Sequence, residues 1–140
     1  PEAATDPAGA VKQVSADVND ALRYTVSLEP ENYLSGKERA YALLRAKGNT
    51  FVREWNAWGD PDTPYRGVNS TWKTASGQLF EVQFHTPESY AVKSSVEIRA
   101  LYEEWRAAGT SPERRAQLAK MMYDKYGAAM PPPGVDLNKP

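Results

Sequence analysis

The segment 78–85 constrains the fold most, because apolar and polar side chains alternate strictly along it. One side of the extended chain is apolar: Phe80, Val82 and Phe84. The other side is polar: Glu81, Gln83 and His85. A period of two residues predicts a β-strand with one face in the core. The polar row is either a solvated sheet surface or the floor of a polar cleft, and the pattern alone favours the solvated surface.

Three other segments have the β-branched and aromatic composition of strands: 20–28, 51–58 and 65–73. The short, polar segment 74–77 would join 65–73 to 78–85 as a hairpin.

Four helices are expected: 9–18, one between Ser35 and Gly48 with a Ser35–Glu38 capping box, 88–108 after an N-cap at Thr86, and 111–127. This order predicts an α+β (mixed α/β) fold, in which a largely antiparallel mixed sheet is flanked by helices that pack against one face.

Chain length and composition limit the domain organisation. At 140 residues, with 41% hydrophobic and 25% charged residues, the chain is expected to form one globular domain. We place it at 11–129, between a flexible N-terminal tail at 1–10 and a Pro-rich C-terminal tail at 130–140. Because the chain starts at Pro1, we expect it to be a processed or excised piece of a longer product.

Charge and cysteine content exclude several classes of function. A net charge of -1 provides no field for a nucleic-acid polymer or an anionic membrane, so neither is an expected partner. The absence of cysteine excludes a disulfide framework, thiolate metal sites and a cysteine nucleophile.

Two carboxylates are candidates for a metal site. Asp20 stands at the start of segment 20–28, and Glu81 lies on the polar side of 78–85. If these strands are neighbours, the two carboxylates would share one Mg²⁺, which one or two carboxylates and substrate phosphates typically hold. The alternative is a capping Asp and an exposed strand Glu.

Segment 65–73 carries candidates for nucleotide binding. Tyr65 would stack on a base, and Asn69 would donate to a sugar or phosphate. The alternative is a strand packed beneath a loop. Several basic residues near the strands would hold phosphates or merely keep the surface soluble: Arg53, Arg66, Lys73 and Lys93.

Three stretches in this order resemble the synthetase domain of the RelA/SpoT alarmone synthetase family, over about 17–102: Asp20-Ala-Leu-Arg23-Tyr-Thr, Tyr65-Arg-Gly-Val-Asn69 and Phe80-Glu81-Val-Gln83-Phe-His85-Thr86. Asn69 stands where that family has His, and His85 where it has Arg. The short spacing from Asp20 to Arg23 makes Asp17 a second candidate for the metal ligand. These variants look closest to secreted ATP nucleotide 3′-pyrophosphokinases and interbacterial toxin (p)ppApp synthetases.

The resemblance implies a nucleotidyltransferase-like synthetase fold and transfer of pyrophosphate from ATP to the 3′-hydroxyl of a purine nucleotide, with adenine favoured. It also implies Mg²⁺ as cofactor, and secretion or delivery into a target cell as a toxin.

The residue roles that it implies fall into three groups. Asp20 and Glu81 would hold the metal, with Glu81 also the general base. Acceptor-nucleotide contacts would come from Tyr65, Asn69, Gln83 and His85. Donor-phosphate contacts would come from Arg23, Arg53 and Lys93.

The resemblance also bears on partners. The family's ATP-gripping basic segment, upstream of the Asp strand, has no counterpart here. We therefore expect an upstream fragment of the same protein, or an immunity protein, as a partner besides ATP and the acceptor nucleotide.

Two other functions stay open. One is a mono-ADP-ribosyltransferase toxin, which Tyr65-Arg66-Gly67, Ser70-Thr71 and the acidic strand resemble, although that family needs its catalytic Glu at the position of Gln83. The other is a catalytically incomplete binding module.

Overall fold

A single mixed sheet organises the molecule. The computed structural model describes residues 12–13 and 22–140, and every structural statement below concerns these. Five strands lie in the order β1-β2-β5-β4-β3. Their bounds are β1 Lys12–Gln13, β2 Leu22–Ser27, β3 Thr50–Asn56, β4 Val68–Lys73 and β5 Leu79–His85. Among the described strands only the β2–β5 pair is parallel, so the predicted α+β fold with a largely antiparallel sheet is confirmed.

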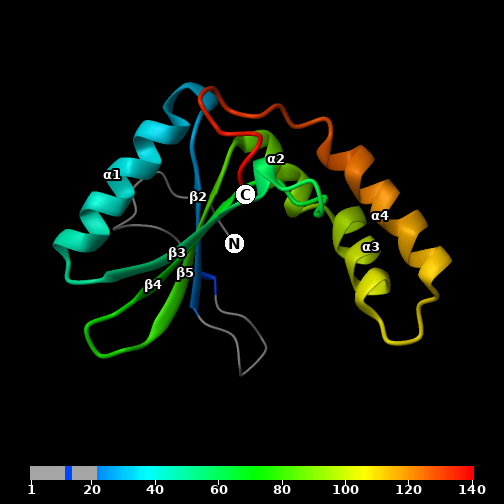
Figure 1. The fold of residues 1–140 in the computed structure, drawn as a ribbon, viewed down its shortest axis with the longest axis horizontal. Helices are drawn as coiled ribbons and strands as arrows, with labels where there is room; N and C mark the ends of the chain where they lie inside the picture. The colour runs from blue at the N-terminus through cyan, green and yellow to red at the C-terminus, as the bar shows by residue number, and fades with distance from the viewer. Residues whose placement is uncertain (1–11, 14–21) are drawn as a thin grey trace.

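In residues 22–140, four α-helices flank the sheet: α1 Tyr33–Ala46, α2 Pro87–Lys93, α3 Val96–Arg106 and α4 Pro112–Tyr126. In Figure 1, α1 lies on one side of the sheet, and α3 and α4 lie on the other. The expectation that the helices pack against one face is therefore wrong. Two short 3₁₀ turns, η2 Pro30–Asn32 and η3 Ala57–Gly59, precede α1 and follow β3.

The helix boundaries differ from the sequence prediction at three places. The expected helix 88–108 is broken in two, because the Ser95 hydroxyl accepts from the Ile98 amide and starts α3 anew. α1 begins at Tyr33, so Ser35 lies inside the first turn and the expected capping box does not form. In the expected helix 9–18, Lys12 and Gln13 form β1 instead, and the rest lies outside the described residues.

The apolar row of β5 packs against α1, as the alternation of segment 78–85 predicts. Tyr41 of α1 contacts Phe84 and Trp72 edge to face, with ring centroids 5.8 and 5.1 Å apart. Tyr33 donates a hydrogen bond of 2.6 Å to the Phe84 carbonyl and accepts one from the Trp58 indole. Because the apolar face of β5 packs against α1, the polar face of β5 turns away from α1.

The loop that enters β4 is held from several directions. Arg66 Nη1 donates to three carbonyls, those of Ala57, Thr63 and Tyr65, at 3.0, 2.9 and 2.8 Å. This guanidinium therefore holds the loop through Nη1, and Arg66 is not among the residues that line the cavity on the polar face of the sheet. From α4, Tyr123 Oη donates to the Pro61 carbonyl at 2.8 Å.

The C-terminal segment returns to the end of β3. Asn56 Nδ2 donates to the carbonyls of Asp136 and Lys139, at 2.7 and 2.9 Å. A Cβ on Gly59 would lie 2.6 Å from the Asp136 carbonyl oxygen, so only glycine admits this approach. Among the described helices, none has the length and apolar content that crossing a membrane would need.

Candidate functional site

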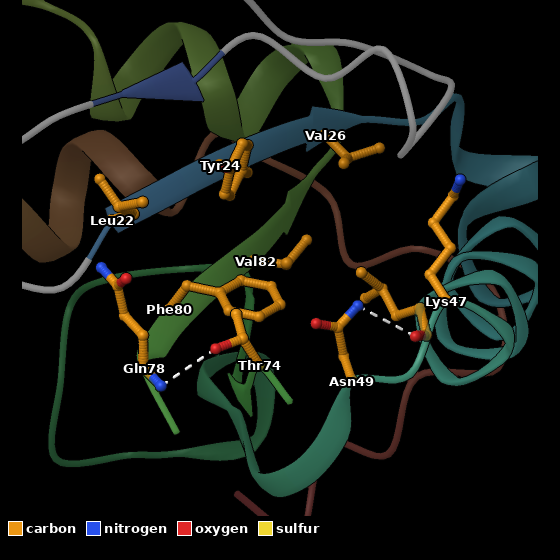
Figure 2. Close-up of a pocket in the computed structure, with 10 residues that line it drawn as sticks. Leu22, Tyr24, Val26, Lys47, Asn49, Thr74, Gln78, Phe80 and Val82 are labelled. Carbon is orange, nitrogen blue, oxygen red and sulfur yellow. Dashed lines mark hydrogen bonds between the residues drawn. The ribbon is translucent and has the colours of Figure 1, made fainter. Parts of the chain in front are cut away.

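In the described part of the chain, each face of the sheet borders a cavity. On the apolar face, a cavity of about 330 Å³ lies between β2, β5 and the end of α1 (Figure 2). Of its described lining residues, only Lys47 is charged. On its rim, the Asn49 side-chain amide donates to the Leu44 carbonyl at 3.0 Å, and Thr74 Oγ1 accepts from the Gln78 main-chain amide at 3.0 Å. This cavity carries no cluster of reactive side chains.

The second cavity, of about 460 Å³, lies on the polar face between the sheet and helices α2 to α4. Its floor follows the strand register, in which Gln83 lies opposite Asn69, and Asn69 opposite Trp55. The other walls come from the loop before β4 and from α2, α3 and α4, including Lys93, Arg99, Tyr102, Trp105 and Tyr126. Of the two interpretations of the polar row, the floor of a cleft is the one that the structure supports.

A chain of hydrogen bonds runs beneath this cavity. His85 is fully buried, and its Nδ1 lies 2.9 Å from Ser89 Oγ while its Nε2 lies 2.8 Å from Tyr65 Oη. Tyr65 Oη donates to Asn69 Oδ1 at 2.8 Å. With the phenol proton on Asn69, a neutral His85 donates from Nε2 to Tyr65 and accepts at Nδ1 from Ser89, whose hydroxyl also lies 3.3 Å from the Thr86 carbonyl oxygen. Each group in the series Ser89, His85, Tyr65 and Asn69 therefore donates a hydrogen bond to the next one.

Burial sets the charges of this chain. It lowers the pKa of His85 to about 3, with a smaller contribution from the positive charge of Lys93, so the imidazole is neutral at physiological pH. Burial also raises the pKa of Tyr65 well above its usual value, which keeps the phenol protonated. The chain thus orients the Tyr65 ring and the Asn69 amide without adding charge.

Two buried polar atoms on residues that line the cavity lack hydrogen-bond partners among the described residues: Gln83 Oε1 and Arg23 Nε. Gln83 is 4% exposed, so its oxygen has little access to bulk water. A buried acceptor without a partner costs about 1–3 kcal/mol, which a ligand donor would recover. Both residues line the cavity, so the unpaired atoms point to a polar ligand.

Cationic side chains from three elements line the same cavity: Arg23, Lys93 and Arg99. Burial, followed by repulsion from Arg23, lowers the pKa of Lys93 to about 8, while Glu81 opposes this shift. Lys93 thus remains mostly protonated at pH 7. The arrangement favours an anionic ligand.

Glu81 lies beside the cavity rather than on its wall. β2 and β5 are neighbours, as the metal hypothesis requires, and Glu81 stands opposite Arg23 with their side chains 3.4 Å apart. Asp20 and Asp17 lie outside the described residues. The described part of the chain holds no group of three or more metal-ligating side chains, and of the predicted metal ligands it includes only Glu81.

The other predicted residues divide by position. Tyr65 is in the loop before β4 rather than on a strand, and it lines the cavity with Asn69, Gln83 and Lys93. Arg53 shares the strand row of Glu81 but is exposed on the outermost strand, with Nε 3.5 Å from Thr71 Oγ1, and is not part of the wall. Lys73 is exposed at the hairpin end of β4.

Sequence reasoning missed three contributors. Trp55 stacks on Tyr65 with ring centroids 5.7 Å apart and planes 24° apart, Arg99 adds a cation from α3, and Ser89 holds His85. The spacing of Ser89, four residues after His85 and three after Thr86, was a usable indication of a capping residue. The sequence gives no such indication for Trp55. An irregularity between Phe51 and Arg53 changes which face of the sheet the later side chains of β3 occupy.

No protein-family model matches the sequence, and no curated protein matches it. Solved structures match its fold. Small alarmone synthetase 2 from Bacillus subtilis aligns at a TM-score of 0.54 and 13% identity, covering 81% of this chain and 61% of that one. This likeness confirms the expected synthetase fold.

Two further solved structures have lower TM-scores. The complex of the Type VI effector Tas1 with its immunity protein gives 0.49 at 26% identity, covering 80% of this chain and 67% of that one. Small alarmone synthetase 1 from Bacillus subtilis, bound to its product pppGpp, gives 0.49 at 19% identity, covering 77% and 54%. The chain spans less than two thirds of the length of both Bacillus proteins.

Proposed function

Because the chain has the fold of an alarmone synthetase, we propose that the 460 Å³ cavity binds a purine nucleotide and that the protein transfers pyrophosphate from ATP to its 3′-hydroxyl. The observation that carries the proposal is Gln83, a residue of the cavity lining whose buried Oε1 has no hydrogen-bond partner among the described residues. A hydroxyl or amine of a nucleotide would supply the missing donor. Arg23 and Lys93, which the family resemblance assigns to the donor phosphates, would bind phosphates together with Arg99.

The role proposed for each residue depends on where it lies relative to the cavity. Tyr65 would stack on the acceptor base, while Asn69 and Gln83 would bond to its polar groups. His85 would contact the acceptor only through Tyr65, because both of its ring nitrogens are already hydrogen-bonded. Arg53 would reach only those donor phosphates that extend to the sheet edge.

The proposed reaction forms a bond between the 3′-oxygen of the acceptor and the β-phosphorus of ATP. The bond from that phosphorus to the α–β bridging oxygen breaks, and AMP leaves. Glu81 would accept the proton of the 3′-hydroxyl as general base. Glu81, together with Asp20, would hold Mg²⁺, which when bound neutralises phosphate charge.

The finer assignments rest on the motif likeness to secreted and toxin synthetases. On that basis we propose an adenine acceptor, secretion or delivery into a target cell, and an immunity protein as partner. Since the chain spans less than two thirds of the Bacillus synthetases, we propose that the rest of the enzyme supplies further ATP contacts.

The substitution Glu81→Gln tests the mechanism in the full-length protein. It keeps the size of the side chain but removes the charge that accepts a proton, so transfer should fall roughly a hundredfold or more. The free energy of unfolding should change by about 1 kcal/mol or less, since the ion pair with Arg23 is partly exposed. Mass spectrometry of products from ATP, Mg²⁺ and adenine or guanine nucleotides measures the transfer.

Glu103→Gln is the matched control, because Glu103 is an exposed glutamate outside the cavity wall. It should work and melt like the wild type. A Glu81→Gln protein that transfers at the wild-type rate removes Glu81 from the mechanism. Consumption of NAD without any pyrophosphorylated product would point to the ADP-ribosyltransferase alternative.

A further inference from the structure

One wall of the 460 Å³ cavity carries an aromatic pair that the proposed roles do not use. Tyr102 and Trp105 lie one helical turn apart on α3, with ring centroids 6.0 Å apart and planes 19° apart. Both line the cavity. In the expected helix 88–108 both side chains fall on one apolar stripe with Ile98 and Leu101, which predicts core positions, but Tyr102 is 45% exposed.

Packing holds this pair in place. A small core of Ile98, Met122 and Tyr126 lies between α3 and α4, and Trp105 packs against it. Arg115 of α4 lies over the Trp105 ring, and Arg106 lies over Tyr102, each guanidinium 5.7 Å from the ring centroid. The rings are therefore oriented before any ligand arrives, and the two guanidinium groups add positive charge beside them.

We propose that Tyr102 and Trp105 form a stacking platform for the base of a purine nucleotide whose phosphates reach Lys93 and Arg99. Arg99 lies one turn before Tyr102 on α3, and Lys93 ends α2. An aromatic surface next to two cations matches a planar base joined to phosphates, and each stacked base adds binding energy without base-specific hydrogen bonds. The inference rests on the proposed function for the class of ligand.

A volume of about 460 Å³ lies in the range of sites for one ligand of small-molecule size. The Trp55–Tyr65 stack and the α3 pair line the same space from the sheet and the helix sides. A base that enters would therefore meet aromatic surface from both sides. Covering the exposed Tyr102 ring would add apolar burial to the stacking.

The test compares ADP, GDP and inorganic pyrophosphate as ligands of the 140-residue chain, by calorimetry with the wild type and with Tyr102→Leu. Leucine keeps an apolar helix-forming side chain but has no π-face. Affinity for ADP and GDP should fall about tenfold, while affinity for pyrophosphate should not change. Met121→Ala is the control, because Met121 on α4 is 41% exposed and does not line the cavity.

Equal affinities of the wild type and Tyr102→Leu for ADP would overturn the inference, as would an equal loss for ADP and pyrophosphate or a wild type that binds neither nucleotide. Product analysis separates this test from that of the proposed function. Tyr102-dependent ADP binding without pyrophosphate transfer would refute the transfer and keep the platform. If the protein transfers pyrophosphate but the Tyr102→Leu change leaves its affinity for ADP unaltered, the platform would be refuted and the transfer kept.

Discussion

His85 shows how one buried side chain organises the polar face. Its ring is neutral, bonded at both nitrogens and sealed from solvent, although it extends the row of Glu81 and Gln83. A neutral imidazole in this position offers no charge to a phosphate. What it provides is direction, because it fixes the phenol of Tyr65 and, through it, the Asn69 amide.

The pKa of His85 predicts how stability depends on pH. The unfolded chain binds a proton at this residue below about pH 6.5, whereas the folded chain does so only near pH 3. Because the unfolded state binds more protons between these values, the free energy of unfolding should fall as the pH falls from 6.5 towards 3. The loss at pH 5 should be about 2 kcal/mol.

Denaturant unfolding at several pH values between 7 and 5 measures this loss. His85 is the only histidine of the chain, so we attribute the loss of stability between pH 7 and 5 to its titration. His85→Gln cannot titrate there and should lose most of the slope, whatever its stability at pH 7. A variant with the wild-type slope would show that the acid sensitivity arises elsewhere.

At the scale of elements, the break between α2 and α3 shapes the cavity. Lys93 ends one helix and Arg99 lies in the first turn of the next, so the break sets how the two cations face the sheet. Ser95 makes this break with two bonds, accepting from the Ile98 amide at 3.2 Å and donating to the Val92 carbonyl at 2.8 Å. In a continuous helix, the 3.6-residue turn would instead have fixed the directions of Lys93 and Arg99 relative to each other.

Ser95→Ala should lower the free energy of unfolding by about 1 kcal/mol, the usual cost of losing an N-cap. Chemical denaturation measures it. Ser94→Ala is the control, since the Ser94 side chain does not cap α3, and its effect should be smaller. Equal effects of the two changes would show that the Ser95 cap does not define the break.

For the whole molecule, two packing centres hold the sheet. α1 packs with β4 and β5 in the larger core, while Ile98, Met122 and Tyr126 form a smaller one between α3 and α4, in the wall of the cavity. The C-terminal segment is tied to the larger one, because Val135 packs against it and Asn56 binds the carbonyls of Asp136 and Lys139.

Removing 131–140 should therefore lower the free energy of unfolding, by on the order of 2 kcal/mol, since Asn56 loses two hydrogen bonds and Val135 its partial burial. Thermal melting and denaturant unfolding of the shortened chain measure this. Lys139→Ala keeps the main-chain carbonyl that Asn56 uses and should change little. An unchanged melting temperature on truncation would agree with the free tail that the proline content predicts.

The sequence by itself determined what depends on near neighbours. Alternation in 78–85 identified β5 and its two faces, and the 74–77 turn identified the hairpin, because side-chain period and turn chemistry act within a few residues. Tertiary structure decided the rest. Pairing of Arg23 with Glu81 across 58 positions, the irregularity that brings Trp55 onto the cavity, and the helices over the polar row all depend on contacts between distant segments. Alternation cannot distinguish a solvated face from a covered one, because both are polar, and only the packing of α3 and α4 made this face a cleft.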